Sequence, residues 1–196
     1  MTAVAPDASV DPSAIVRGDV RIGARSRVLA GAILDAGDGV LAVGESVIVM
    51  EQAVLRASAR FALTVGDHVL IGPHASVSGA WIDDEVFVAT NAAIFPGAVL
   101  GRGAEVRVNG VVQVRTRLEA GATVPIGWVA VGDPAPILPP DRHDEIWAAQ
   151  EPLDFPGTVF GVDRNAPDAM VQLTERYSRA IERLSRSVPR GARDRR

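Results

Sequence analysis

Two histidines are the residues of this sequence most suited to chemistry near neutral pH. His68 and His74 lie six residues apart in the stretch LTVGDHVLIGPHASVSG, and the chain has one further histidine, His143. An imidazole titrates close to neutrality, so it can act as a general base or bind a metal ion. The chain has no cysteine, which excludes a thiolate nucleophile and a cysteine metal site. The first question is whether the fold turns the two side chains toward a common site.

A six-residue repeat governs the part of the chain that contains both histidines. From Val10 onwards the sequence divides into blocks that begin with Val, Ile or Leu, among them VDPSAI, VRGDVR, VGDHVL, IGPHAS, IFPGAV and LEAGAT. One block is too short to bury its apolar residue alone, so stacked coils must form the core. Aromatic residues make up only 5% of the chain, in keeping with a narrow aliphatic interior. We therefore predict an all-β solenoid.

The fourth position of the repeat predicts where the coils turn. Glycine and asparagine recur there, and both accept a positive φ. Histidine is also enriched among non-glycine residues with positive φ. His68 and His74 both occupy this position, so they are interpreted first as exposed corner residues without a chemical role. The full set comprises Asp19, Gly31, His68, His74, Asn91, Gly97, Gly103, Asn109 and Gly121.

Charge and hydropathy argue against several classes of partner. The net charge of −4 gives no reason to expect nucleic-acid binding. No apolar run approaches the roughly 20 residues that span a bilayer. The N-terminus lacks the basic and apolar regions of a signal peptide. We expect a cytoplasmic protein that binds neither membranes nor nucleic acid.

Several irregularities of the repeat are specific enough to suggest a family. They are the start IVRGDVRIG, the irregular block between Leu34 and Ala42, the excursion LRASARFALT, the short coil VSGAW and the segment GDPA at 132–135. With these features residues 8–140 resemble the γ-class carbonic anhydrase-like branch of the hexapeptide-repeat, LpxA-like proteins. The resemblance implies a left-handed parallel β-helix, assembled as a homotrimer whose metal ion is held by three histidines at each subunit interface.

The same resemblance implies that the metal site is replaced in this chain. The family's three histidine positions fall on Arg56, Pro73 and Ser78, and its helper positions fall on Asp35 and on Met50–Glu51. Arginine and proline cannot serve as zinc ligands, and a lone serine is a poor one. We therefore expect neither a metal nor another cofactor, and no competent CO2 hydratase.

The replaced site suggests a different chemistry at the subunit interface. The planar guanidinium of Arg56 suits a carboxylate or phosphate. Arg56, Ser78 and Asp84 are therefore predicted to bind a small anionic molecule, such as an organic acid or a thioester. His74 and Glu51 are the candidate acid–base groups. The alternative is that Arg56 forms a salt bridge between subunits and the site is purely structural.

Two other functions stay open, and with them the question whether the protein is an enzyme. Many left-handed β-helix proteins are CoA-dependent acyltransferases that use one histidine as base, a role open to His68 or His74. Basic residues for the CoA phosphates are limited, in the late coils, to Arg102, Arg107, Arg115 and Arg117. The remaining alternative is a non-catalytic trimeric scaffold, which no ligand would stabilise.

The chain is expected to divide into four segments. Residues 1–9 lead into the β-helix, 10–135 form it, 136–187 add C-terminal α-helices and 188–196 are a disordered basic tail. In the extension, PPDRHDEIWAAQ is typical of a short helix with prolines at its start, in which His143 is a solvated residue. A second, amphipathic helix is predicted by the helical spacing of Met170, Leu173, Tyr177, Ile181 and Leu184.

Overall fold

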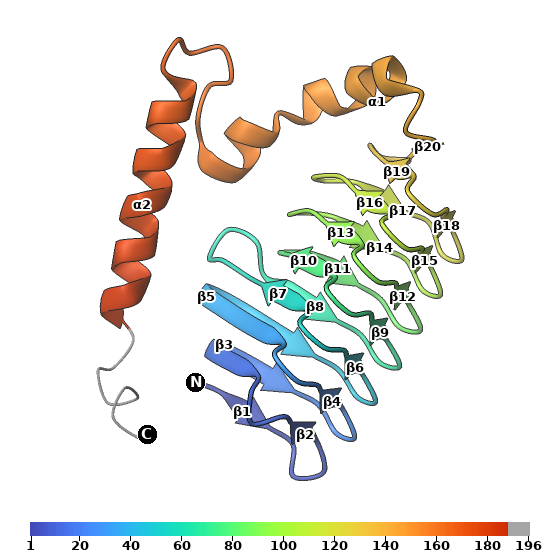
Figure 1. The fold of residues 1–196 in the computed structure, drawn as a ribbon, viewed down its shortest axis with the longest axis vertical. Helices are drawn as coiled ribbons and strands as arrows, with labels where there is room; N and C mark the ends of the chain where they lie inside the picture. Colours follow the sequence, from blue (N-terminus) through green and yellow to red (C-terminus); the bar gives the residue numbers. More distant parts are fainter. Residues whose placement is uncertain (188–196) are drawn as a thin grey trace. The chain divides into compact units, whose positions relative to one another are not determined.

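Short strands separated by turns stack into a parallel β-solenoid over most of the chain (Figure 1). The computed structural model describes residues 1–187. They fall into a first unit, Met1–Leu153, which contains the solenoid, and a second unit that begins at Asp154. The predicted all-β, left-handed β-helix with C-terminal helices is confirmed.

Two sheets make up the solenoid. The larger has thirteen strands: β1 (Ala3–Val4), β3 (Ile15–Ile22), β5 (Ile33–Val43), β7 (Val54–Arg56), β8 (Leu63–Val65), β10 (Ser76–Ser78), β11 (Trp81–Ile82), β13 (Ala93–Ile94), β14 (Val99–Leu100), β16 (Val111–Val112), β17 (Arg117–Leu118), β19 (Val129–Ala130) and β20 (Ile137–Leu138). The smaller has seven: β2 (Ser9–Val10), β4 (Arg27–Val28), β6 (Ile48–Val49), β9 (Leu70–Ile71), β12 (Phe87–Val88), β15 (Glu105–Val106) and β18 (Thr123–Val124).

The solenoid has three faces, because the long strands β3 and β5 each continue around a corner. The first halves of β3 and β5 pair with each other, and β5 then pairs with β7. Together with β10, β13, β16 and β19 they form what we call the first face. The second halves of β3 and β5, with β1, β8, β11, β14 and β17, form the second face. The seven-stranded sheet is the third face.

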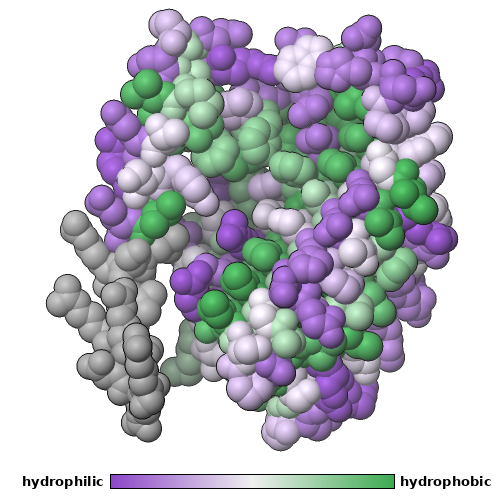
Figure 2. Space-filling view, in the orientation of Figure 1, coloured by the Kyte–Doolittle hydropathy of each residue, from purple (hydrophilic) through white to green (hydrophobic). Residues whose placement is uncertain are grey.

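The core is a stack of aliphatic side chains inside these faces. Leu34, Leu55, Val77 and Ile94 are register neighbours on the first face, and each is at most 2% exposed. Each of them is the aliphatic residue that begins a block of the repeat, the position predicted to face the core. Because side chains alternate along a strand, the residues on either side of them point outward. Some hydrophobic side chains also reach the surface, in patches among hydrophilic ones (Figure 2), and Trp81 is 57% exposed.

The corners are built from residues in the left-handed conformation, as the repeat predicts. His68 and His74 have φ angles of 57° and 58°, and Asn91 and Asn109 have 58° and 57°. Such residues also bond to the coil before them: the His74 N–H donates to the carbonyl oxygen of Glu51 over 3.1 Å. The prediction is wrong for Asp19, which lies within β3. The neighbouring Gly18 takes the positive φ there, at a shift in the pairing of β3 with β5.

The ends of the solenoid differ from the expected bounds. The first strand is β1, which pairs with β3, so the coils begin within residues 1–9. At the other end β20 pairs antiparallel with β19 and covers its free edge. The chain then forms helix α1 (His143–Gln150) and a 3-10 turn at Glu151–Leu153, both still within the first unit.

The second unit holds a π-helical turn at Pro156–Phe160 and helix α2 (Ala169–Ser187). Phe160 joins them, since its ring meets the Tyr177 ring edge-on at 5.8 Å. The predicted amphipathic helix is present; the side chain of Leu184 and the predicted tail at 188–196 lie outside the described residues. None of the helices in the described part has the length and hydropathy of a bilayer-spanning segment.

Candidate functional site

An outward-facing row of polar side chains crosses the first face near the ends of its strands. Strand pairing aligns Arg17 with Asp35, Asp35 with Arg56, and Arg56 with Ser78. Four successive coils therefore place a cation, an anion, a cation and a hydroxyl group in one line across the face. The structure thus brings together Arg56 and Ser78, two of the predicted binding residues.

Arg56 is a cation without a counter-charge in this row. The Asp35 carboxylate between the two arginines accepts a hydrogen bond from Arg17 Nη2 at 2.7 Å and from the Gly37 N–H at 3.1 Å. Arg56 is exposed, and within residues 1–187 it forms no ion pair or side-chain hydrogen bond. A guanidinium in this state is available to an anionic group from outside the chain.

His74 and Glu51 lie at the opposite edge of the first face from Arg56 and Ser78. They stack on one corner through the hydrogen bond between their backbones, and His74 is exposed. Strand β10 begins two residues after His74 and ends at Ser78. At the rise of a strand, the four residue steps from His74 to Ser78 place their Cα atoms up to about 13 Å apart. A single chain therefore does not bring His74 to Arg56 and Ser78.

Asp84 lies on a different corner of the solenoid, away from the row. Its Oδ1 accepts a hydrogen bond from the Asp67 N–H at 2.8 Å, and Asp67 Oδ1 in turn accepts one from the Glu45 N–H at 2.7 Å. These aspartates therefore cap the backbone of the coil before them. The predicted role of Asp84 as a ligand of the same site as Arg56 has no support from this position.

His68 stands on the same corner as Asp84, in a column of charged residues. Its N–H donates to the Glu45 carbonyl oxygen, and the next coil places Glu85 above it. Glu85 pairs with Arg102 at 2.5 Å, and this hydrogen-bonded guanidinium holds the pKa of the Glu85 carboxyl below its usual value. Glu85 and Arg102 neutralise each other, and His68 is bonded to the corner through its backbone, so the residues of this corner are interpreted as structural.

The residues of the first face do not fit the metal centre of the resembled family. Arg56 and Ser78, at two of its histidine positions, are register neighbours, and Pro73 directly precedes His74. A guanidinium and a proline ring offer no lone pair for zinc. Within residues 1–187 no three His, Asp or Glu side chains lie together in a way that could hold a metal ion.

Some neighbours of Arg56 were not singled out from the sequence. Arg17 belongs to the motif IVRGDVRIG, but its pairing with Asp35 depends on the register of β3 and β5. Arg60 and Phe61, in the excursion after β7, are a second case: the Arg60 guanidinium lies 5.5 Å from the Phe61 ring centroid. The only signal in the sequence was the length of the excursion, which interrupts the six-residue repeat.

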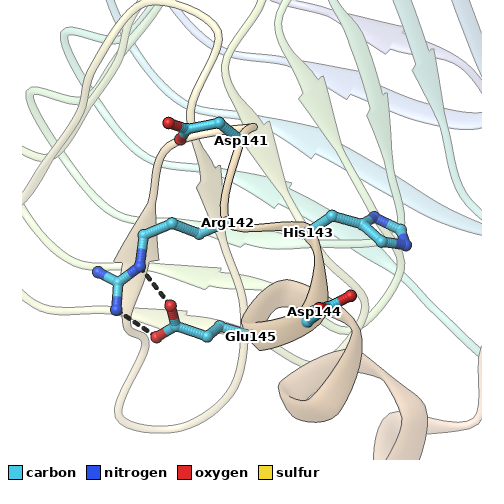
Figure 3. Close-up of a pocket in the computed structure, with 5 residues that line it drawn as sticks. All are labelled: Asp141, Arg142, His143, Asp144 and Glu145. Carbon is cyan, nitrogen blue, oxygen red and sulfur yellow. Dashed lines mark hydrogen bonds and ion pairs between the residues drawn. The ribbon is translucent and has the colours of Figure 1, made fainter.

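A shallow pocket also occurs at the start of α1, lined by Asp141, Arg142, His143, Asp144 and Glu145 (Figure 3). Arg142 and Glu145 form a two-bonded ion pair at one side of it, while His143 points the opposite way (Figure 3). All five residues are consecutive in the chain, and the arginine is already neutralised. This pocket is therefore a weaker candidate for binding an external ligand than the row of Arg17, Asp35, Arg56 and Ser78.

Comparison with known proteins agrees with the fold and with the resemblance. No protein-family model matches the sequence. The mitochondrial proteins gamma carbonic anhydrase 2 and gamma carbonic anhydrase 1 of Arabidopsis thaliana are 28% and 29% identical to it over 146 residues, or 71% of this chain. The chain spans about half the length of these curated relatives, 50% and 51%.

A solved structure shares the fold over almost the whole chain. A proposed acetyltransferase of Bacillus cereus superposes with a TM-score of 0.52 over 94% of this chain and 91% of its own, at 18% sequence identity. At that identity the likeness concerns the fold alone. Together the relatives and the fold show that this chain is similar to γ-class carbonic anhydrases and has the left-handed β-helix of hexapeptide-repeat proteins.

Proposed function

We propose that this protein binds a small carboxylate at the position where the family that it resembles is expected to hold a metal ion. The observation that carries the proposal is the state of Arg56, an exposed arginine whose neighbouring carboxylate, Asp35, is already bonded to Arg17 and to the Gly37 N–H. A guanidinium offers two parallel N–H groups that match the two oxygens of a carboxylate. Ser78, next to Arg56 in register, adds a hydroxyl donor.

The proposed binding site is completed by a neighbouring chain in a homotrimer. Around a threefold axis one edge of a face on each subunit meets the other edge on the next subunit, in a heterologous contact. The first face carries His74 and Glu51 at one edge and Arg56 and Ser78 at the other. A threefold arrangement then brings His74 of one chain to Arg56 of the next, which the span of about 13 Å along a single strand prevents within one chain.

The composition of the first face supports burial in such a contact. A second row of outward-facing side chains runs along the middle of the first face and consists of small or aliphatic residues. Charged groups occur only at the edges of the face. The row is Ile15, Ile33, Val54, Ser76, Ala93, Val111 and Val129. Ile15 is 45% exposed in the single chain. Depletion of charge at the centre with polar groups at the rim is the usual anatomy of a protein interface.

In this arrangement His74 supplies the acid–base chemistry and Arg56 the charge. The carbon chain of a carboxylate held by Arg56 would then face the imidazole of His74, which would serve as the general base or acid. Glu51, one coil below His74 and bonded to it through the backbone, is the second acid–base group of the proposal. Hydration of CO2, the activity named in the relatives, is not proposed, because Arg56, Pro73 and Ser78 do not form a zinc site. Acyl transfer is not proposed either, since the likeness to the Bacillus cereus protein is one of fold.

The test is calorimetric titration of the trimer with acetate, propionate and pyruvate at constant ionic strength. We expect at least one acid to bind, and Arg56→Ala to weaken it at least about tenfold, because hydrogen bonds to charged groups contribute about 1.5–3 kcal/mol. Arg56→Lys should keep part of the affinity, since it retains the charge and loses the fork. Arg25→Ala, which removes an arginine from another corner, is the matched control. Binding that Arg56→Ala leaves intact, or no binding at all, would reject the proposal; the latter result would favour a scaffold.

A further inference from the structure

The excursion between β7 and β8 is anchored on the solenoid by one aromatic ring. A Cβ atom at Gly79 would lie 2.4 Å from Phe61 Cβ, and one at Gly97 would lie 3.4 Å from Phe61 Cε1. Phe61 therefore runs along the corner across two successive coils whose glycines make room for it. Reciprocal backbone hydrogen bonds between Ser58 and Phe61 close the loop, and the Ala59 N–H donates to Asp38 Oδ1 at 2.8 Å. These contacts give the excursion a defined position beside Arg56.

Two further arginines border the same ring. The Arg60 guanidinium lies over Phe61, at 5.5 Å from the ring centroid. Arg115 stands on the next coil of this corner, with φ 54°, and its Cγ would be 3.2 Å from a Cβ at Gly97. The aliphatic stem of Arg115 and the ring edge of Phe61 thus border one position. Both arginines are exposed.

Within the described residues, none of the three arginines at this corner, Arg56, Arg60 and Arg115, forms an ion pair with a carboxylate. In residues 1–153 every arginine outside the corner contacts a carboxylate, with the exception of Arg27, which donates to the carbonyl oxygens of Asp7 and Ser26. Neither Arg56 nor Arg115 has a polar side-chain partner in the described chain, and Arg60 has only the ring. Contact with an aromatic ring leaves the charge of Arg60 in place.

The backbone fixes how far apart these cations stand. The Gly79 N–H donates to the Arg56 carbonyl oxygen, the Gly97 N–H to that of Gly79, and the Arg115 N–H to that of Pro96. Arg56 and Arg115 are therefore three coil steps apart, or about 14 Å at the usual spacing of strands. Phe61 contacts both intervening coils, at Gly79 and Gly97, and the Arg60 guanidinium lies over its ring. Flexible arginine side chains from both ends shorten the gap that a ligand must span.

We infer that the ligand held at Arg56 carries a second anionic group, a few carbon atoms from the first, which Arg60 and Arg115 bind. The expected class is a linear dicarboxylate. This inference rests on the proposed function, because it takes Arg56 as the site of the first carboxylate. It adds what that proposal leaves open: the size and charge of the ligand, and two residues that select it. A singly charged acid would leave two exposed cations without a partner.

The experiment compares two six-carbon acids, adipate with two carboxylates and hexanoate with one, by calorimetry at constant ionic strength. The variants are Arg60→Gln, Arg115→Asn and their combination; asparagine tolerates the positive φ of residue 115. We expect adipate to bind the wild type at least tenfold more tightly than hexanoate, about 1.4 kcal/mol. The double variant should bind both acids equally, with the hexanoate affinity unchanged. Arg56→Ala should weaken both, and unliganded melting temperatures show that each variant folds.

The outcomes separate this inference from the proposed function. Equal binding of adipate and hexanoate by the wild type would overturn the dicarboxylate inference and leave Arg56 as a monocarboxylate site. An adipate preference that survives in the double variant would also overturn it, because the second carboxylate would then be bound elsewhere. If the wild type binds neither these acids nor the shorter acids tested for Arg56, the proposed function fails, and the inference fails with it.

Discussion

At the scale of single residues, the identity of one side chain changes what the first face can bind. An arginine at a position suited to a metal ligand supplies a permanent positive charge without any ion. It also cannot be removed by chelators. The proposed chemistry of this protein therefore depends on the exposed Arg56, which lies beside an already bonded Asp35.

Close coil spacing predicts that Gly66 tolerates no side chain. A Cβ atom there would lie 2.5 Å from Asp84 Oδ1 and 2.8 Å from the Asp84 backbone nitrogen. Gly66→Ala should therefore lower the free energy of unfolding by about 1–3 kcal/mol, the usual cost of overpacking, as measured by urea denaturation. Gly121→Ala is the control, since nothing lies within 4 Å of its Cβ position and only its φ of 70° opposes the change. A smaller effect at Gly66 than at Gly121 would contradict this close packing of Gly66 against the next coil.

The Glu85–Arg102 pair predicts part of the acid sensitivity of the fold. Arg102 holds the pKa of Glu85 in the folded state below its ordinary value of 4.5. The resulting stabilisation is present above that value and is lost as the pH falls through the lowered pKa. Arg102→Met should therefore reduce stability near pH 7 but have less effect near pH 3, a difference visible in urea midpoints at the two pH values. An equal effect at both would mean that the pair adds nothing.

At the scale of elements, the excursion after β7 depends on the seat of Phe61. Phe61→Ala removes the ring that borders Gly97 and lies under the Arg60 guanidinium, and it keeps the Cβ atom beside Gly79. We expect amide hydrogen exchange to rise across residues 58–61, because the remaining hydrogen bonds are local and exposed. The amides of β7 and β10, which pair with each other, should keep their protection. Unchanged exchange in the excursion would show that its hydrogen bonds, and not the ring, hold it.

The same scale shows which elements a sequence can predict. The inward residues and the left-handed corners follow from a six-residue period, because each depends on contacts with the next coil of the same repeat. Asp19 is the exception, since the strand β3 runs through its corner with Gly18 as the kink. The seat of Phe61 on Gly79 and Gly97 was beyond reach, because it joins an insertion to coils that follow it. The period says nothing about where an insertion packs.

At the scale of the whole molecule, the first face should be the contact between subunits. Ala93 lies in the middle of its outward row. Ala93→Arg should convert a trimer into monomers in light scattering after size exclusion, since it places an unpaired charge inside the contact. Thr64→Arg, on the second face beside Trp81, is the matched control and should leave the trimer intact. A wild type that is monomeric, or a trimer that only Thr64→Arg dissociates, would place the contact elsewhere or remove it.

The candidate site could be predicted only in part, because some of its residues meet within one chain and others would meet only between chains. The nearness of Arg56 and Ser78 follows from the register of one sheet and is found in the single chain. In the proposed trimer, the nearness of His74 to them depends on a second chain, and Asp84 lies on another corner altogether. A repeat sequence fixes which coil a residue belongs to, but which edges of two molecules meet is decided by the surfaces of folded chains. The cytoplasmic location expected from the sequence likewise stays a prediction, and the Arabidopsis relatives are mitochondrial proteins by name.

The most direct test of a cationic site in place of a metal centre is the metal content of the protein. Untagged protein, purified without chelators, would be analysed by elemental mass spectrometry against its chain concentration. We expect no zinc, iron or cobalt in stoichiometric amount, for wild type and for Arg56→Ala alike. One metal ion per chain in the wild type would contradict the replacement, and would mean that another set of ligands, including His74, forms a centre between subunits.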